Sequence, residues 1–342
     1  MDGAAKRKGR TPAVFAALFL LLFVFMVLDL TQAYDPLTFK EAFWALLGKG
    51  TETHRFIVWE MNLPRVIMAC LVGAGLGIAG AVMQAVFRNP MASPYILGLS
   101  SGASLGAAVG LTFTVAWLPQ MLMIPLLAFV SCMATLFLVY YISNIGGRVP
   151  TETLLLAGIA VGSLLSALVS LLTYLAGEQM QGIVYWTMGN LTNATWENIL
   201  IVAPLIFAGS LIMVSSSRDL NAMMLGDAHA LDLGVEVKRV RLQLLVASAL
   251  VTAAAVAFVG VIGFIGLVVP HILRILMGPD NRLLLPASLL GGAAFLMICD
   301  YISRVIAPNS IGILPIGIVT ALIGAPYFIY LLRRRRTEVG WD

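Results

Sequence analysis

Two glycine-containing patterns in the sequence match motifs that bind a cofactor or carry a nucleophile in other proteins. Residues 75–80 read Gly-Leu-Gly-Ile-Ala-Gly, the glycine spacing of a dinucleotide-binding loop. Residues 98–102 read Gly-Leu-Ser-Ser-Gly, the spacing of a nucleophile elbow centred on Ser100. Each pattern normally follows a β-strand, whereas here each lies in an apolar segment, so we interpret both as helix packing or pore lining. The sequence contains no Gly-x-x-x-x-Gly-Lys-Ser/Thr loop, which excludes ATP binding by that route.

Histidine and cysteine spacing predicts no metal centre. His54, His229 and His271 belong to no His-Glu-x-x-His set, so a zinc hydrolase is not supported. The three cysteines match no metal or redox motif, and we expect free thiols packed as small apolar residues. They are Cys70, Cys132 and Cys299.

Ionisable residues within apolar segments are few, and Asp300 is the best candidate for coupling transport to an ion gradient. Arg304 follows it by one helical turn, so a local ion pair is the simpler interpretation. An ion-coupled secondary transporter stays open as the alternative and would require Asp300. A membrane-embedded enzyme is a further alternative and would require Ser100 or His271.

The elements that carry these residues are apolar segments of transmembrane length. Of 342 residues, 60% are apolar and 11% charged, whereas soluble domains have about 25% charged residues. A bilayer core needs about 20 apolar residues per helix, which predicts an all-α polytopic membrane protein with ten transmembrane helices. The expected spans are 13–33, 64–86, 95–116, 121–143, 152–176, 197–215, 241–259, 261–277, 284–304 and 313–332. The division between the seventh and eighth spans is expected around Gly260 and Gly263, because residues 242–277 are too long for one crossing.

Basic residues predict the orientation. With a cytoplasmic N-terminus and ten spans, 16 of the 21 Lys and Arg residues fall on the inside, so both termini are expected in the cytoplasm. The first span could instead be a secretory signal, but it continues to Asp29 without a convincing cleavage site. We therefore expect a single permease domain over 1–342 with short cytoplasmic tails at 1–12 and 333–342.

Three stretches outside the expected spans are long enough to have a role. Residues 36–47 predict an external amphipathic helix, with Asp35 as its N-cap and Gly48 as its stop. Residues 177–197 form a second external stretch with interfacial aromatic residues. Residues 215–241 predict a cytoplasmic loop of two short helices, capped by Asp219 and Asp227 and stopped by Gly226 and Gly234.

Several longer motifs resemble the permease subunits of bacterial and archaeal ABC importers for iron chelates and vitamin B12. The resemblance covers residues 60 to 332 in the family's order. The matching motifs are Asn-Leu-Pro-Arg at 62–65 and the segments 80–98, 154–158, 185–189, 263–274 and 314–326.

The resemblance implies a type II ABC importer permease fold with ten transmembrane helices. It implies a second permease copy, with a homodimer favoured over a close heterodimer, two cytoplasmic ATPase subunits and an external substrate-binding protein. ATP and Mg²⁺ would be bound by the ATPase, so this chain is expected to hold no cofactor or metal and to have no catalytic residue. Nucleic acid is not an expected partner.

The resemblance also assigns roles to particular residues. The cytoplasmic loop would couple to the ATPase through apolar and acidic side chains. Its residues are Asn221, Ala222, Met223, Leu225, Gly226, Asp227, Leu231 and Asp232. Binding-protein docking would use Arg65 and Arg304, with Asn62 standing where the family more often has a first arginine.

The translocation path and its inner gate are expected near the start of the fifth span. Thr151 and Glu152 occupy the gate position implied by the resemblance, and Met83 and Gln84 are further candidates to line the path. The implied function is alternating access that carries an iron chelate, haem or cobamide across the cytoplasmic membrane. The sequence does not choose among these substrates.

Overall fold

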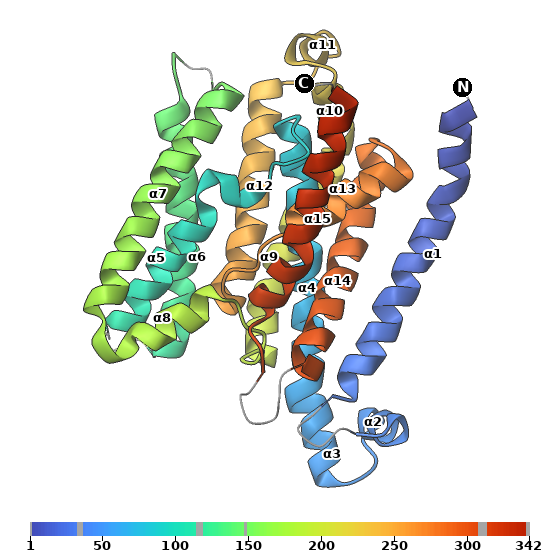
Figure 1. Ribbon diagram of the computed structural model, residues 1–342, viewed down its shortest axis with the longest axis vertical. Helices are drawn as coiled ribbons and strands as arrows, with labels where there is room; N and C mark the ends of the chain where they lie inside the picture. Colours follow the sequence, from blue (N-terminus) through green and yellow to red (C-terminus); the bar gives the residue numbers. More distant parts are fainter. Residues whose placement is uncertain (1, 33–36, 114–118, 147–148, 307–312, 340–342) are drawn as a thin grey trace.

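The computed structural model describes residues 2–32, 37–113, 119–146, 149–306 and 313–339, and in these ranges it is helical with no β-strand. Figure 1 shows the helices running roughly parallel, with α10 and α11 at one end of the bundle and α2 and α3 at the other. The long helices are α1 (Asp2–Leu30), α4 (Leu63–Val86), α5 (Leu99–Thr112), α6 (Gln120–Ser143), α7 (Thr151–Leu175), α9 (Trp196–Ser215), α12 (Val237–Val259), α13 (Ile265–Met277), α14 (Asn281–Ile306) and α15 (Ile316–Val339). The short helices are α2 (Phe39–Leu46), α3 (Glu52–Phe56), η1 (Ile57–Asn62), η2 (Pro94–Leu97), η3 (Gly177–Gln179), α8 (Met180–Thr187), α10 (Ser217–Met224) and α11 (Asp227–Asp232).

Each of the ten expected spans coincides with one of the long helices. Among the described residues, seven helices are long and apolar enough to cross a membrane by themselves, whereas α5, α13 and the apolar part of α15 are shorter. The all-α polytopic prediction is therefore confirmed, and the number of ten crossings stays a prediction. The expected tails 1–12 and 333–342 are largely helical, because α1 begins at Asp2 and α15 continues to Val339.

The predicted break after the seventh span is confirmed. Helix α12 ends at Val259, and Gly260 has a φ of 73° that a residue with a side chain rarely adopts. The chain then runs through non-helical backbone until α13 begins at Ile265. Two shorter helices thus replace one continuous helix.

Helix α4 lies at the centre of one packing group and is buried along most of its length. Its close contact with α14 depends on glycine, since a Cβ at Gly73 would lie 2.9 Å from the Cβ of Leu296. The group also contains α1, α9, α12 and α13. Helices α5 to α8 form a second group, seen to the left in Figure 1, which meets the first mainly along α12.

The α2–α3 end differs from the sequence prediction in its boundaries. The helix predicted for this stretch is present as α2, and its external side stays a prediction. Its N-cap is Thr38, whose side chain and backbone exchange hydrogen bonds with Glu41 in a capping box. Asp35, which was predicted to be the cap, lies outside the described residues. Gly48 ends the helix as expected, with a φ of 73°. Helices α3 and η1 lead directly into α4. The continuous helical segment therefore begins at Glu52, twelve residues before the predicted span 64–86.

The two-helix loop at the other end is confirmed as α10 and α11, and both termini lie at this same end (Figure 1). The predicted caps were wrong, because the N-caps are Ser216 and Gly226. Asp219 lies in the first turn of α10 and Asp227 is the first residue of α11. Gly226 and Gly234 do follow the two helices as predicted.

Candidate functional site

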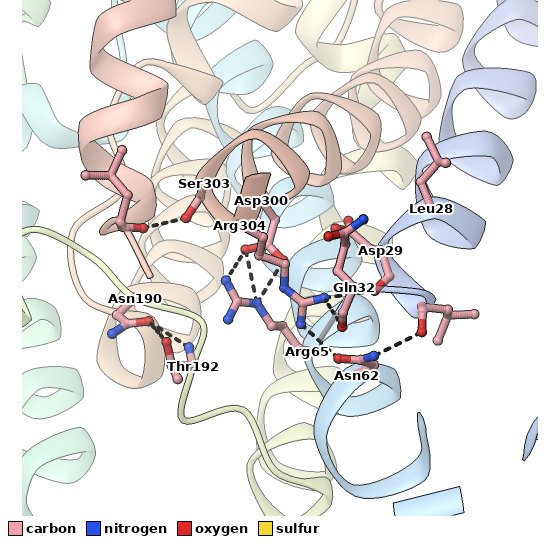
Figure 2. Close-up of polar contacts among 12 residues, drawn as sticks. Leu28, Asp29, Gln32, Asn62, Arg65, Asn190, Thr192, Asp300, Ser303 and Arg304 are labelled. Carbon is pink, nitrogen blue, oxygen red and sulfur yellow. Dashed lines mark hydrogen bonds and ion pairs between the residues drawn. The ribbon is translucent and has the colours of Figure 1, made fainter. Parts of the chain in front are cut away.

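A buried cluster of charged side chains joins α1, α4 and α14 near the α2–α3 end. Arg65 of α4 makes a two-pronged contact with Asp300 of α14, with Nη2 2.6 Å from Oδ1 and Nε 2.9 Å from Oδ2. Figure 2 shows this pair side by side with Arg304 and Asp29. The side chains of Arg65 and Asp300 are 4% and 1% exposed, so the pair is shielded from solvent within the chain.

Arg304 and Asn62 complete the cluster by binding backbone as well as side chains. Arg304 donates from Nη1 to the Asp29 carbonyl at 2.8 Å and from Nη2 to Asn62 Oδ1 at 3.1 Å. Asn62 in turn donates to the Leu30 carbonyl at 2.9 Å. The predicted pair of Asp300 with Arg304 is present but longer, at 3.8 Å. These contacts fix the end of α1 against α4 and α14.

Asp29 is the member of the cluster that the sequence reasoning undervalued. Its side chain is fully buried, and its carboxylate oxygens accept no hydrogen bond from the described residues. Its carboxyl group lies close to Asp300 as well as to the guanidinium groups of Arg304 and Arg65. The residues around Asp29 could not be predicted from local sequence, since Arg65 and Asp300 come together from positions 235 residues apart.

The placement of Asn62, Arg65 and Arg304 bears on their expected role in docking. All three are buried or nearly so, and each is held by contacts within the chain. Docking through these residues stays a prediction, and it would require the arginines to exchange their present partners for those of another protein. Because Arg65 binds Asp300, the Asp300 carboxylate is not free to bind and release a transported ion, as an ion-coupling site must.

At the opposite end, α10 is fastened to the start of α14 through Asn221. Its Nδ2 donates to Asp280 Oδ1 at 2.8 Å, and its Oδ1 accepts from the Asn281 backbone at 2.9 Å. The hydrogen bond from Arg282 is the largest of several that lower the pKa of Asp280 from its ordinary value of 3.8 to about 2. Asn221 is thus a structural contact between the loop and the bundle.

The other expected coupling residues divide into buried and exposed groups. Met223 is buried beneath α10, and Ala222 is partly buried. Leu225 and Leu231 are 69% and 60% exposed, and Asp232 is exposed beside them. Leu225, Leu231 and Asp232 are therefore expected coupling residues that a partner can reach.

Asp227 binds two arginines of its own chain, and its expected contact with the ATPase stays a prediction. Its Oδ2 accepts from Arg241 of α12 at 2.7 Å, and its Oδ1 accepts from Arg88 at the end of α4. Arg88 has a φ of 47°, a left-handed conformation that costs a residue with a side chain roughly 1–2 kcal/mol. The sequence reasoning missed Arg88 as a functional candidate, because only the backbone conformation singles it out.

The expected path and gate residues lie in different surroundings. Glu152 is exposed and Thr151 half-buried at the start of α7, at the same end as α10 and α11. Met83 and Gln84 are buried inside α4, where Gln84 donates to the Leu267 carbonyl at 2.9 Å. The latter two therefore line no open surface in the described chain.

Helix α7 instead presents a stripe of hydroxyl groups that the sequence reasoning missed. Ser163, Ser166 and Ser170 recur at helical spacing and are exposed, and Ser166 Oγ lies 2.9 Å from Ser101 Oγ of α5. A groove of about 660 Å³ runs between η2, α5 and α7 past this contact. The i, i+3, i+7 serine spacing was the sequence signal that could have revealed it.

No group of three or more histidine, cysteine, aspartate or glutamate side chains suited to a metal ion occurs among the described residues. All three cysteines are free. Ser100 lies at the start of α5, and nothing in its setting resembles a nucleophile on a strand-to-helix turn.

Comparison with known proteins decides the family. The FecCD transport family matches residues 20–334. The chain belongs to this family. The cobalamin import system permease protein BtuC of Halobacterium salinarum is 44% identical over 289 residues, which cover 84% of this chain and 76% of the relative. The hemin transport system permease protein HmuU of Yersinia pestis is 40% identical over 304 residues, covering 87% and 89%.

A FecCD relative and a solved structure support the same conclusion. The Fe(3+) dicitrate transport system permease protein FecD of Escherichia coli is 39% identical over 283 residues, covering 83% of this chain and 87% of that protein. A metal-chelate type ABC transporter in an inward-facing conformation superposes with a TM-score of 0.84 at 32% identity, covering 94% and 99% of the two chains. This FecCD chain is therefore a multi-pass membrane permease subunit of an ABC importer, and ATP hydrolysis belongs to a separate subunit.

Proposed function

We propose that this permease imports a metal chelate, either a cobamide, haem or a ferric siderophore, through a path between two copies of the chain. The relatives named above import cobalamin, hemin and ferric dicitrate, which are bulky chelates of a metal ion. We assign ATP and Mg²⁺ to the partner ATPase and no cofactor to this chain.

The observation that carries the proposed path is the serine stripe on α7. Polar residues in a membrane segment commonly face a bundle interior or a water-filled cavity, because hydrocarbon gives hydroxyl groups no partner. Ser163, Ser166 and Ser170 are exposed on this chain, and Ser163 and Ser166 line a groove of about 660 Å³. A second copy placed against this face would enclose the stripe, and hydroxyl groups would hold a passing chelate only weakly.

We place the α10–α11 end in the cytoplasm and the membrane in the bacterial or archaeal cytoplasmic membrane. The support is the excess of Lys and Arg on the inner side of the predicted topology, together with both termini at the α10–α11 end (Figure 1). Thr151 and Glu152 at the start of α7 would then close the inner mouth of the path. The exposed Leu225 and Leu231 would seat against the ATPase, while an external binding protein would dock at the α2–α3 end.

The experiment is reconstitution of the permease in liposomes with an ATPase subunit and a panel of binding proteins loaded with cobalamin, haem or ferric siderophores. We expect one loaded binding protein to stimulate ATP hydrolysis and to drive uptake of its chelate. Replacing both Leu225 and Leu231 by Ser should weaken assembly with the ATPase, whereas Lys238→Ala, an exposed change at the start of α12, should not. Failure of the wild-type permease to assemble with any ATPase would refute the proposal.

A further inference from the structure

Asp227 lies at the meeting point of three separate elements at the α10–α11 end. Its two carboxylate oxygens accept hydrogen bonds from two different guanidinium groups, those of Arg88 and Arg241. Arg241 belongs to α12, and Arg88 lies two residues after the last residue of α4. The first residue of α11 is therefore tied to α4 and α12 at once.

Arg88 occupies a position where the backbone favours glycine. The chain reverses there after α4, with Asn89 N–H donating to the Gln84 carbonyl at 3.0 Å, which is the pattern of a Schellman cap. The left-handed residue of such a cap is most often glycine, because glycine has no Cβ to clash. The ion pair with Asp227 is a contact that only a long cationic side chain at this position can make.

The exposed Leu231 and the ion-paired Asp227 lie on the same short helix, α11. Leu231 of α11 is exposed, and Leu225 immediately precedes the Gly226 cap. Helix α10 is anchored separately, through Asn221, to the start of α14. A force applied to α11 can thus reach α4 through Asp227 and Arg88. The ion pair resists separation of α11 from the end of α4.

We propose that Arg88, Asp227 and Arg241 are positioning residues that carry the movement of α11 into α4 and α12 during the transport cycle. This inference rests on the proposed function, since it takes an ATPase acting on the loop as given. It assigns Asp227 to contacts within the chain instead of to the ATPase surface. Coupling of this kind requires an element that moves between two states and carries its neighbours with it.

The test compares Arg88→Gly with Arg88→Lys in the reconstituted complex of permease, ATPase and binding protein. Glycine suits the left-handed backbone, so Arg88→Gly should fold and melt at or above the wild-type temperature. It lacks the cation, so we expect the chelate imported per ATP hydrolysed to fall at least about fivefold, the lower range of measured couplings between sites. Arg88→Lys keeps the charge and should retain most of the import.

The matched control is Arg239→Gly, two residues before Arg241 on the same helix turn of α12. Arg239 is largely exposed and makes only a 3.6 Å contact with Glu236, so import per ATP should stay close to wild type after allowance for any loss of stability. Asp227→Asn is a second variant, which should reproduce the uncoupling of Arg88→Gly.

The outcomes separate the inference from the proposed function. A wild-type complex that does not import any chelate refutes the proposed function, and the inference with it. A wild-type complex that imports, together with an Arg88→Gly complex that imports equally well per ATP, refutes the inference alone. A parallel fall of melting temperature and import in Arg88→Gly also refutes it, because the arginine would then only stabilise the fold.

Discussion

Replacing Asp300 by Asn should destabilise the permease strongly, because it removes the negative charge that two buried arginines share. In the wild type, Asp300 binds Arg65 and lies 3.8 Å from Arg304, with Asp29 beside them. After Asp300→Asn, the two guanidinium groups, which are 4% and 9% exposed, would lose this carboxylate. Asparagine keeps the size of the side chain, so the change tests charge and not packing.

The expected loss can be worked out from the burial of the pair. Removing one partner of a buried ion pair costs about 3–5 kcal/mol, since the other charge is left uncompensated away from water. At about 2.1 cal/mol/K per residue, 342 residues have an unfolding entropy of roughly 0.7 kcal/mol/K. The melting temperature of Asp300→Asn should therefore fall by about 4–7 °C.

The assay is thermal unfolding of the purified permease in detergent at neutral pH, with two comparison variants. Arg65→Met combined with Asp300→Leu removes the whole pair and leaves Arg304 bound to the carbonyls of Asp29 and Gln32, so it should melt closer to the wild type than Asp300→Asn does. Glu236→Gln breaks a surface pair with Arg239 that spans 3.6 Å, and it should cost less than about 1 kcal/mol. Equal melting of Asp300→Asn and wild type would refute the stabilising role of the buried ion pair between Arg65 and Asp300.

Two further predictions concern packing and pH. Gly80→Ala should lower the melting temperature, because its Cβ would overlap the backbone of Gly266, whereas Gly263→Ala has open space and should be nearly neutral. The pKa of Asp280 is lowered to about 2, so its contribution to stability is present above about pH 4 and is lost as the pH falls toward 2. Unfolding followed over this range should show a smaller acid dependence in Asp280→Asn.

Much of the fold could be predicted because hydrophobic length is a strong signal. Apolar runs of about 20 residues located every long helix, and Gly260 marked the division between α12 and α13. The boundaries were weaker where two signals competed. Thr38 with Glu41 is a capping box that could have been read from the sequence, and it defines the start of α2 in place of Asp35.

The contacts of the candidate sites could not be predicted to the same degree. Arg65 and Asp300 meet only because α4 packs against α14, and no local pattern encodes a contact across 235 residues. Asp227 was expected to cap α11 and to contact a partner. In the structure its carboxylate accepts hydrogen bonds from Arg88 and Arg241, which belong to distant parts of the sequence. Local pattern indicates where a charged residue lies along a helix, whereas tertiary packing decides which charge it meets.

Helix α4 connects the two clusters and explains how one end of the permease can respond to the other. It carries Arg65 in its first turn, and Arg88 follows its last turn, so the two lie about 35 Å apart at 1.5 Å per residue. Between them, close glycine contacts hold α4 against α14, which leaves little room for bending. A displacement at Arg88 would therefore move α4 with its packing group as one body, relative to the separate group of α5 to α8 that carries the serine stripe. Movement of one group against the other would shift the serine stripe relative to α4, and alternating access requires a relative movement of this kind.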